Sequence, residues 1–458
     1  MNIKEIQEKL NKVLANKDLS YVIKGSFFTA ASMILIQGLR MIGGVLIARY
    51  YGADVQGELR LLTVLLSSVV ILANFGLKDA MLRLIPEYRE KDNLRASWEI
   101  YKKGLYYLFL FGAIGAVVIV SIVPWFAKYN EVQEIQSILT LSAAFLFALL
   151  LNEYNVFTLR AILKIKKANY VSVIMVALRL VALIVAINFF FAEKRAPLYI
   201  YLYIICGGTA IASSYLIYKH FYLPSREFTA TVKIKSNQLL MMSFPMLMTY
   251  ASFLINDKAD SLMIQGITKD TALLGVYGIC LNLADIGRMG MQAMNVTIQP
   301  KLSQMFHSGR VHEMKNMTQK TSKTFALLNI PITLLLIFGG TFLLGIYGQE
   351  YKIGASSLAI LAFGQMINTF AGPTAQLLNV TGHHKQFMII AFVGAMINIA
   401  LNIFMIPAYG IFGAAIASAT SMASWNIIAS IFIRKKFGFF VGYIPFVSEL
   451  YINKKELK

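Results

Sequence analysis

Long apolar runs separated by short polar connections dominate the hydrophobic pattern of the chain. The runs are about 20–28 residues long, and a helix of that length spans a hydrocarbon core of roughly 30 Å. The pattern therefore predicts an all-α integral membrane protein. We place twelve transmembrane helices at residues 24–48, 57–85, 99–126, 134–159, 168–191, 196–219, 237–264, 272–300, 322–347, 355–380, 386–408 and 410–433.

The amino-acid composition agrees with this class. Of the 458 residues, 57% are hydrophobic and 14% are charged, and the mean hydropathy is +0.62. A soluble protein carries about 25% charged residues. Cys206 and Cys280 both fall inside apolar runs, where we expect small packed side chains and neither a disulfide nor a metal site.

Residues 1–23 differ from the rest of the chain in being polar and basic. They contain no short apolar core followed by a small-residue cleavage site, so we expect no signal peptide. Their apolar residues recur at helical spacing opposite lysines and glutamates, which predicts an amphipathic helix on the membrane surface. A frayed cytoplasmic tail is the alternative.

The basic residues are distributed unevenly between the two sets of connections. The N-terminus, the loops after even-numbered spans and the C-terminal tail hold 30 of the 43 lysines and arginines. The loops after odd-numbered spans hold five: Lys128, Lys194, Arg195, Lys269 and Lys352. This asymmetry places both termini in the cytoplasm of a multi-pass protein of the cell (inner) membrane. The net charge of +20 is scattered among short loops, which argues against nucleic acid as a partner.

The longest connections all lie on the cytoplasmic side, and the one at 220–236 divides the spans into six and six. We therefore expect an N-terminal lobe at 24–219, a linker at 220–236, a C-terminal lobe at 237–433 and a basic tail at 434–458. Since six is even, both lobes have the same orientation and form a parallel pseudo-repeat. The turns YYGADVQGEL and GITKDTALLGVYG share glycines and an acidic residue.

Several stretches, in this order along nearly the whole chain, resemble a known family. They are LIARYYGADVQGE, NDKADSLMIQGITKDTALLGVYGICLNLAD, IQPKLSQMFHSGR, FGGTFLLGIYGQEYKIGASSLAILAFGQ, LLNVTGHHKQ and IPAYGIFGAAIASATS. The family is that of the polysaccharide-synthesis oligosaccharide-lipid flippases, often called O-antigen flippases after the lipopolysaccharide component. The resemblance implies the multidrug/oligosaccharidyl-lipid/polysaccharide exporter fold, with two six-helix lobes around a central cavity.

The same resemblance implies a function. A polyprenyl-diphosphate-linked oligosaccharide would be flipped to the outer leaflet by alternating access, with membrane lipids and polysaccharide-assembly enzymes as further partners. The family has no universal catalytic motif to transfer, so the resemblance implies a transporter and not an enzyme.

Charged residues inside the spans are the candidates for a site, because a charge at mid-bilayer costs about 2.5–3.5 kcal/mol and usually faces a cavity or a partner. Arg40 has no acidic residue within four positions, and Arg179 has none within ten. Each must therefore bridge to another helix, for example to Glu153 or Asp285, or face water, or meet an anionic ligand. A guanidinium fork suits a diphosphate, because it donates two parallel hydrogen bonds.

Arg49 and Arg60 lie on the two arms of the first outer hairpin. We predict that they ring the outer mouth of the cavity and attract the diphosphate as it crosses the membrane. Snorkelling of these side chains to lipid phosphates is the plain alternative.

In the second half, acidic and basic residues are near neighbours. Asp285 and Arg288 are three apart on one helix face, and Lys258 lies between Asp257 and Asp260. Structural pairing at this spacing is easy. Two functional alternatives stay open: Arg288 contacts the substrate, and Asp257, Asp260 and Asp285 form a proton or sodium site.

Other functions are disfavoured. No Gly-Lys dipeptide occurs, so there is no phosphate-cradling loop for ATP. The outer loops, about 2–10 residues long, are too short for a glycosyltransferase or ligase acting on lipid-linked sugars, and we expect no metal and no cofactor. The strongest rival is a cation-coupled multidrug antiporter of the same fold. Members of that branch usually carry an acidic residue in the first span, where this chain has Arg40.

Overall fold

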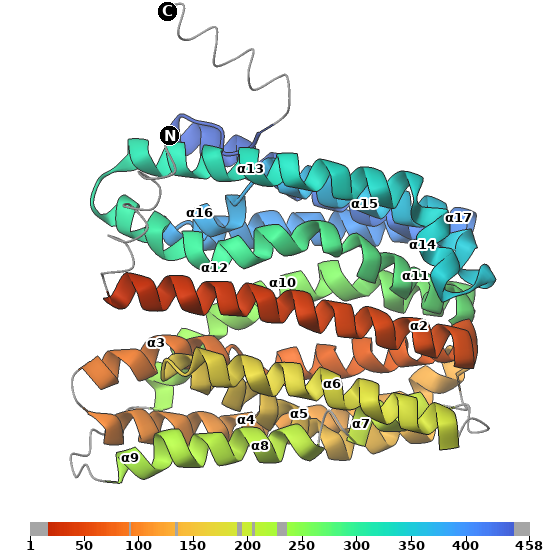
Figure 1. Ribbon diagram of the computed structural model, residues 1–458, viewed down its shortest axis with the longest axis horizontal. Helices are drawn as coiled ribbons and strands as arrows, with labels where there is room; N and C mark the ends of the chain where they lie inside the picture. Colours follow the sequence, from red (N-terminus) through yellow and green to blue (C-terminus); the bar gives the residue numbers. More distant parts are fainter. Residues whose placement is uncertain are drawn as a thin grey trace, which may run out of the picture.

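The computed structural model describes residues 17–90, 93–132, 136–189, 195–203, 207–226 and 236–443. Throughout these residues the chain is helical apart from short turns (Figure 1). Residues 1–16, 227–235 and 444–458 lie outside them, so most of the predicted surface helix, linker and tail is not described.

The helices follow the order of the predicted spans. In the first half they are α2 Lys17–Asn74, α3 Leu77–Glu90, α4 Leu94–Tyr129, α5 Gln136–Ala161, α6 Ile165–Phe189, α7 Ala196–Tyr203, α8 Thr209–Ile217, the π-helical turn η3 Tyr218–Tyr222 and α9 Leu223–Ser225. In the second half they are α10 Ser236–Thr268, α11 Thr271–Ala284, α12 Ile286–His307, α13 Val311–Phe338, α14 Gly340–Tyr347, the 3-10 turn η4 Gln349–Gly354, α15 Ala355–Ala371, α16 Thr374–Val380 and α17 His384–Phe437.

The described helices confirm a multi-pass all-α membrane protein. Seven of them are long and apolar enough to cross a membrane, or eight if α11 and the first part of α12, bent by 42°, form one span. Two of the seven, α2 and α17, each cover two predicted spans. The number twelve itself stays a prediction.

Two bends lie at predicted breaks between spans. Gly52 in α2 has φ 86° and ψ 176°, and Gly410 in α17 has φ 56° and ψ −133°, so each of these elements consists of two helices joined at a glycine. Glycine adopts these positive φ values without the clash that a Cβ atom would cause. Pro373 lies at the break between α15 and α16, whereas Pro331 lies inside α13.

Large apolar side chains cover the outside of the bundle. Phe338 is 82% exposed and Phe342 is 74% exposed. Many other isoleucine, leucine and phenylalanine side chains are similarly uncovered. Patches of this kind are rare on soluble monomers, and lipid chains are the solvent that suits them.

The helices pack in two groups. The N-terminal group, α2–α9, is held by contacts such as those of α2 with α6, α4 with α5, and α5 with α8. The C-terminal group, α10–α17, is held by α10 with α17, α15 with α17, and α13 with α15. The two groups meet most extensively where α2 packs against α11 (Figure 1).

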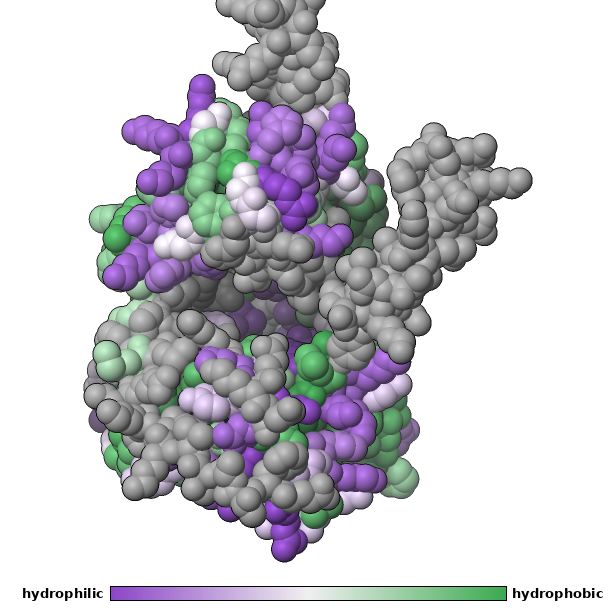
Figure 2. Space-filling view, turned by 90° about the vertical axis from the view of Figure 1, so that its left-hand side faces the viewer, coloured by the Kyte–Doolittle hydropathy of each residue, from purple (hydrophilic) through white to green (hydrophobic). Residues whose placement is uncertain are grey.

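The molecule has two different ends. We call the end formed by residues 87–90, 93–103, 160–167 and 301–323 the basic end; it lies at the left of Figure 1. The opposite end carries the turns at Gly52 and Gly410 and lies at the right. Figure 2 looks onto the basic end and shows a hollow between an upper and a lower mass of the protein.

At the opposite end the two groups touch backbone to backbone. A Cβ atom on Gly57 would lie 1.8 Å from the carbonyl oxygen of Thr271, and one on Gly275 would lie 2.2 Å from the carbonyl oxygen of Ala53. No side chain fits at either glycine unless the groups move apart. Gly57 and Gly275, which belong to the two predicted turns, therefore allow the backbones of the two groups to approach this closely.

Polar contacts add to the closure. Gln265 Nε2 on α10 donates to the carbonyl oxygen of Asn130 at the end of α4, at 3.2 Å. The Lys269 ammonium lies 3.7 Å from the centre of the Tyr129 ring and donates to the carbonyl oxygen of that residue. The protein is thus closed at the opposite end and hollowed at the basic end.

A charged pair lies inside the N-terminal group. The Lys78 ammonium donates to Glu153 Oε1 at 3.0 Å, and Asn74 Nδ2 donates to Glu153 Oε2 at 3.2 Å. The Lys78 side chain is 10% exposed, and its ammonium also lies 5.0 Å and 4.5 Å from the ring centres of Phe157 and Tyr250. The pair ties α3 to α5, and Tyr250 brings α10 of the C-terminal group to it.

Replacing Glu153 by leucine leaves the Lys78 ammonium buried without its carboxylate, which costs about 3 kcal/mol or more. We expect a melting temperature several degrees lower for Glu153→Leu in detergent, and recovery in the double variant Lys78→Leu/Glu153→Leu. Glu313→Leu, which breaks an exposed pair with Arg310, is the matched control and leaves the melting temperature unchanged. Equal melting temperatures for Glu153→Leu and Glu313→Leu would refute a stabilising role for the buried pair.

Candidate functional site

Among the predicted site carboxylates whose side chains are described, Asp260 on α10 is the most buried, at 2% exposed. Tyr277 on α11 donates its hydroxyl to Oδ2 at 2.8 Å, and Asn402 on α17 donates Nδ2 to Oδ1 at 2.7 Å. Ser418, beyond the turn in α17, also donates to Oδ2. Three neutral donors from two helices therefore contact this carboxyl group.

A second asparagine extends this network. Asn398 lies one turn before Asn402 on the same face of α17, and its Oδ1 accepts from Asn402 Nδ2 at 3.0 Å. The Oδ1 atom of Asn402 is buried and has no hydrogen-bond partner among the described residues. A buried acceptor of this kind beside a carboxylate suits a proton or a small hard cation, which binds carboxylate, amide and hydroxyl oxygens.

Sequence reasoning found Asp260 and missed its partners. The available signal was the pair Asn398 and Asn402, four apart in an apolar run, which places two amides on one helix face. Of the other acidic residues predicted nearby, the side chain of Asp257 lies outside the described part, so its role stays a prediction. Lys258 is half-buried.

Asp285 and Arg288 form the local pair that their spacing predicted. Arg288 Nη2 donates to Asp285 Oδ2 at 2.9 Å, and Gln365 Nε2 on α15 donates to Asp285 Oδ1 at 3.4 Å. Asp285 is the residue between α11 and α12, where the span bends. Both charged side chains are about one-third exposed, so the pair is accessible at the bend.

Arg49 and Arg60 both reach the C-terminal group. Arg49 Nε donates to the carbonyl oxygen of Ile346 at 2.6 Å, and Arg60 Nε donates to Ser261 Oγ at 3.1 Å. The aliphatic part of Arg60 packs over Gly278, where a Cβ atom would lie 3.3 Å from Arg60 Cγ. In this closed form both arginines therefore help to join the two groups.

Arg40 and Arg179 lie at similar depth on neighbouring parallel helices. The register of α2 against α6 is fixed by Asn169 Nδ2, which donates to Thr29 Oγ1 at 2.9 Å, and farther along by Gly43, which faces Leu180. A helix rises about 1.5 Å per residue. This register therefore places Arg40 and Arg179 within a few ångströms of each other along the helix axes. Arg40 is exposed and Arg179 is half-exposed.

The predicted candidates therefore fall into three places. Arg40 and Arg179 share one level of the N-terminal group, and Arg49 and Arg60 join the two groups. Asp260, Asp285 and Arg288 lie in the C-terminal group, the first in its own network and the other two as a pair. Within the described residues, histidine, cysteine, aspartate and glutamate form no cluster of three that would hold a metal ion.

Comparison with known proteins identifies two protein families that match parts of this chain. The family described as "Polysaccharide biosynthesis protein" matches residues 22–306, and the family described as "MatE" matches residues 245–404. An uncharacterized membrane protein of Methanocaldococcus jannaschii, MJ1068, is 23% identical over 77% of this chain and 72% of its own length. The probable low-salt glycan biosynthesis flippase Agl15 of Haloferax volcanii is 29% identical, over 35% of this chain and 34% of its own length.

Solved structures share the architecture. A multidrug resistance MATE family transporter in an inward-facing conformation has a TM-score of 0.75 at 13% identity, covering 90% of this chain and 98% of its own. The lipid II flippase MurJ in an inward closed conformation has a TM-score of 0.69 at 14% identity, covering 90% and 89%. At these identities the likeness establishes a membrane-transporter fold. Because the family match extends over more than half of its length, the chain belongs to the polysaccharide biosynthesis protein family, a flippase family of the multidrug/oligosaccharidyl-lipid/polysaccharide exporter superfamily.

Proposed function

We propose that this protein flips a polyprenyl-diphosphate-linked oligosaccharide from the cytoplasmic to the outer leaflet by alternating access. The two helix groups are the two lobes, with six spans each, and the hollow between them is the cavity (Figure 2). The family match and the glycan flippase name of one relative support this cargo. The concentration of lysine and arginine at the basic end supports a cytoplasmic position for that end and for both termini.

The observation that carries the proposal is the common depth of Arg40 and Arg179. A diphosphate presents two neighbouring anionic groups, and two guanidinium forks on adjacent helices can each donate paired hydrogen bonds to one of them. An anionic cargo that reaches this level meets two positive charges on adjacent helices, and both favour its binding. The cargo's head group therefore enters through the basic end and stops at this level.

The other arginines act later in the cycle. Arg49 and Arg60 are engaged across the closed end through Ile346 and Ser261. When the lobes rock and the opposite end opens, both guanidinium groups leave these partners and face the exit. They then draw the diphosphate outward, while Arg288, beside Asp285 at the bend of the eighth span, contacts the cargo from the C-terminal lobe.

Asp260 supplies the coupling. We place a proton or a sodium ion at its carboxylate, with the unpartnered Asn402 oxygen and Ser418 Oγ as further ligands. Binding removes or balances the negative charge and rearranges the hydrogen bonds of Tyr277. Because Asp260 is followed directly by Ser261, which accepts from Arg60, this rearrangement reaches the closed end. Asp257 and Asp285 are secondary candidates for the same role.

A cation-coupled multidrug antiporter of the same fold is the second candidate. It is favoured by the MatE family match over residues 245–404, which includes Asp260, and by the multidrug transporter among the similar structures. Export of cationic dyes by cells that express the protein would support it. The exposed Arg40 in the first helix disfavours a cationic cargo, because like charges repel.

Loss of either deep arginine should slow flipping. In proteoliposomes with a fluorescent polyprenyl-diphosphate oligosaccharide, we expect Arg40→Ala and Arg179→Ala each to reduce the initial rate by tenfold or more, because a charge-assisted contact worth about 1.5–3 kcal/mol is lost. Arg40→Lys, which keeps the charge and loses the fork, should fall in between. Arg310→Ala, an exposed residue at the basic end, is the control and keeps the wild-type rate. Wild-type rates in both alanine variants would remove these arginines from the mechanism.

A methyl group added at the closed end should favour the conformation in which that end is open. Gly57→Ala places a Cβ atom against the Thr271 carbonyl, so the equilibrium shifts toward the form that is open at the opposite end. A cysteine introduced at Gln56, which is buried in this closed form, should then react faster with a membrane-impermeant maleimide added from outside, while flipping slows. Gly38→Ala in the same helix, where nothing lies within 4 Å of the new atom, is the control. Identical labelling rates for the two variants would contradict the closure.

Neutralising Asp260 should uncouple transport from its driving ion. With Asp260→Asn we expect gradient-driven accumulation of the cargo to disappear, whether a proton or a sodium gradient is imposed, while cargo binding persists. Asp54→Asn removes an exposed carboxylate and serves as the control. Gradient-driven accumulation at the wild-type level in Asp260→Asn would exclude the site from coupling.

A further inference from the structure

Asn282 on α11 carries an amide group well inside the membrane. Its side chain is exposed, and it forms no hydrogen bond within the described part of the chain. Asn282 lies about 17 Å along α11 from Thr271, at about 1.5 Å per residue, in a hydrocarbon core that is roughly 30 Å thick. An amide group at this depth needs a polar partner, because lipid chains offer none.

The Asn282 side chain is directed toward the N-terminal group. Gly275, Gly278 and Asn282 follow one another at spacings of three and four residues, so they lie on one face of α11. The two glycines contact the N-terminal group, at the backbone of Ala53 and the side chain of Arg60. Asn282, the next position on this face toward the basic end, is exposed. On this face the contact therefore ends before Asn282, where the hollow between the groups begins.

Gln37 on α2 lies at the same level. Its Nε2 donates to the carbonyl oxygen of Asn282 at 3.2 Å, and within the described residues its Oε1 accepts no hydrogen bond. Gly44, two turns farther along the same face of α2, also faces the C-terminal group. The exposed apolar side chains of Leu35 and Ile42 lie on the opposite face, which suits lipid. Gln37 is therefore turned toward the space between the groups.

These two amide groups are next to the proposed position of the diphosphate. Gln37 and Arg40 are three residues apart on α2, or about 4.5 Å along its axis. An amide both donates and accepts hydrogen bonds, as a sugar hydroxyl does, whereas a phosphate oxygen only accepts. The pair Gln37 and Asn282 therefore complements a sugar better than a second phosphate.

We propose that Gln37 and Asn282 bind the first sugar of the cargo, the one attached to the diphosphate. This site rests on the proposed function, because Arg40 and Arg179 hold the diphosphate one helical turn away. A polyprenyl diphosphate without a sugar leaves both amide groups unpaired. A site that is built to hydrogen-bond a hydroxyl group discriminates against an analogue that lacks it. The two residues therefore select the glycosylated carrier lipid over the bare one.

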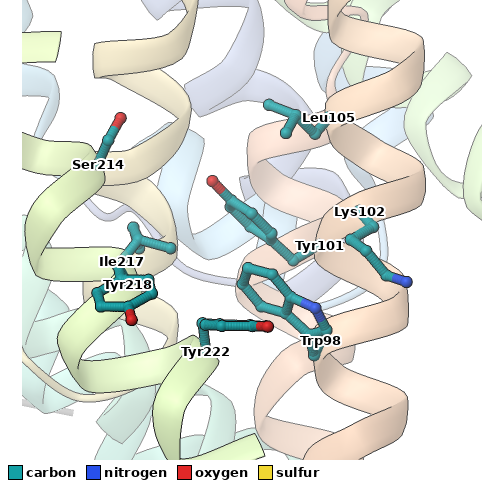
Figure 3. A pocket seen from close by; sticks show the side chains of 8 residues that line it. All are labelled: Trp98, Tyr101, Lys102, Leu105, Ser214, Ile217, Tyr218 and Tyr222. Atoms are coloured by element: carbon teal, nitrogen blue, oxygen red, sulfur yellow. The ribbon is translucent and has the colours of Figure 1, made fainter. Parts of the chain in front are cut away.

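The aromatic pocket of the N-terminal group is a different place where a sugar could stack. It has a volume of about 320 Å³ and lies between the start of α4 and η3 (Figure 3). On its walls the rings of Trp98 and Tyr222 lie 5.0 Å apart, and its lysine, Lys102, is paired with a glutamate. The pocket belongs to the N-terminal group alone and lies at the lower edge of the molecule in Figure 1. It therefore provides a control for the site between the groups.

The test measures the binding of two synthetic probes to the full chain in detergent. One probe is a short-chain polyprenyl diphosphate, and the other is the same lipid carrying one N-acetylglucosamine. We expect the sugar to raise the affinity of the wild type about tenfold, because neutral hydrogen bonds are gained. Asn282→Leu and Gln37→Leu should lose most of this gain and bind the sugar-free lipid as the wild type does, which also shows that they are folded. Arg40→Ala should weaken the binding of both probes.

Two control variants should keep the full effect of the sugar. Asn188→Leu removes another exposed asparagine, near the end of α6, and Tyr218→Ala changes the aromatic pocket. The full sugar effect in both Asn282→Leu and Gln37→Leu, or its loss in Tyr218→Ala, would overturn this sugar site and leave the proposed function standing. Weak binding of both probes to the wild type would overturn the proposed function and the sugar site with it.

Discussion

Charge inside an apolar membrane is the constraint on which this structure depends. Each buried ion must find a partner within the protein or meet one that arrives from outside, since a lone charge at mid-bilayer costs about 2.5–3.5 kcal/mol. The chain uses three solutions. Lys78 and Glu153 neutralise each other between helices, and neutral donors contact the Asp260 carboxyl group. Arg40 and Arg179 share one level of the N-terminal group, where we propose that an anionic cargo binds.

The position of the Asp260 network is also important for this constraint. It lies on α10 and α11, the helices that also form the closed end through Gly275 and Lys269. Ser261, the next residue after Asp260, accepts from Arg60 of the other group, and Tyr277 precedes the glycine on which Arg60 packs. Occupation of the proposed cation site and separation of the two groups would therefore act on the same short segments. This is the arrangement that coupling requires, because a ligand shifts a conformational equilibrium only through contacts that differ between its states.

The sequence predicted the helical membrane class and the local pair Asp285–Arg288, because apolar length and i,i+3 spacing are both local properties of a helix. It identified Asp260 as a costly charge, but Tyr277 and Asn402 could not be assigned to it. Neutral polar residues are common in spans, and Asn402 lies 142 positions away. The breaks predicted at 48–57 and 408–410 contain the turns at Gly52 and Gly410, but the common depth of the two deep arginines depends on how helices pack against each other. Periodicity along one helix does not contain that information.

The central claim is that the diphosphate of the cargo binds to Arg40 and Arg179 in the N-terminal lobe. Its most direct test is an experimental structure of the protein with a polyprenyl-diphosphate oligosaccharide bound. We predict that phosphate oxygens lie within about 3 Å of the guanidinium nitrogens of both Arg40 and Arg179. A diphosphate bound elsewhere, with each of these arginines held by a carboxylate of a neighbouring helix or turned toward the lipid chains, would contradict the account.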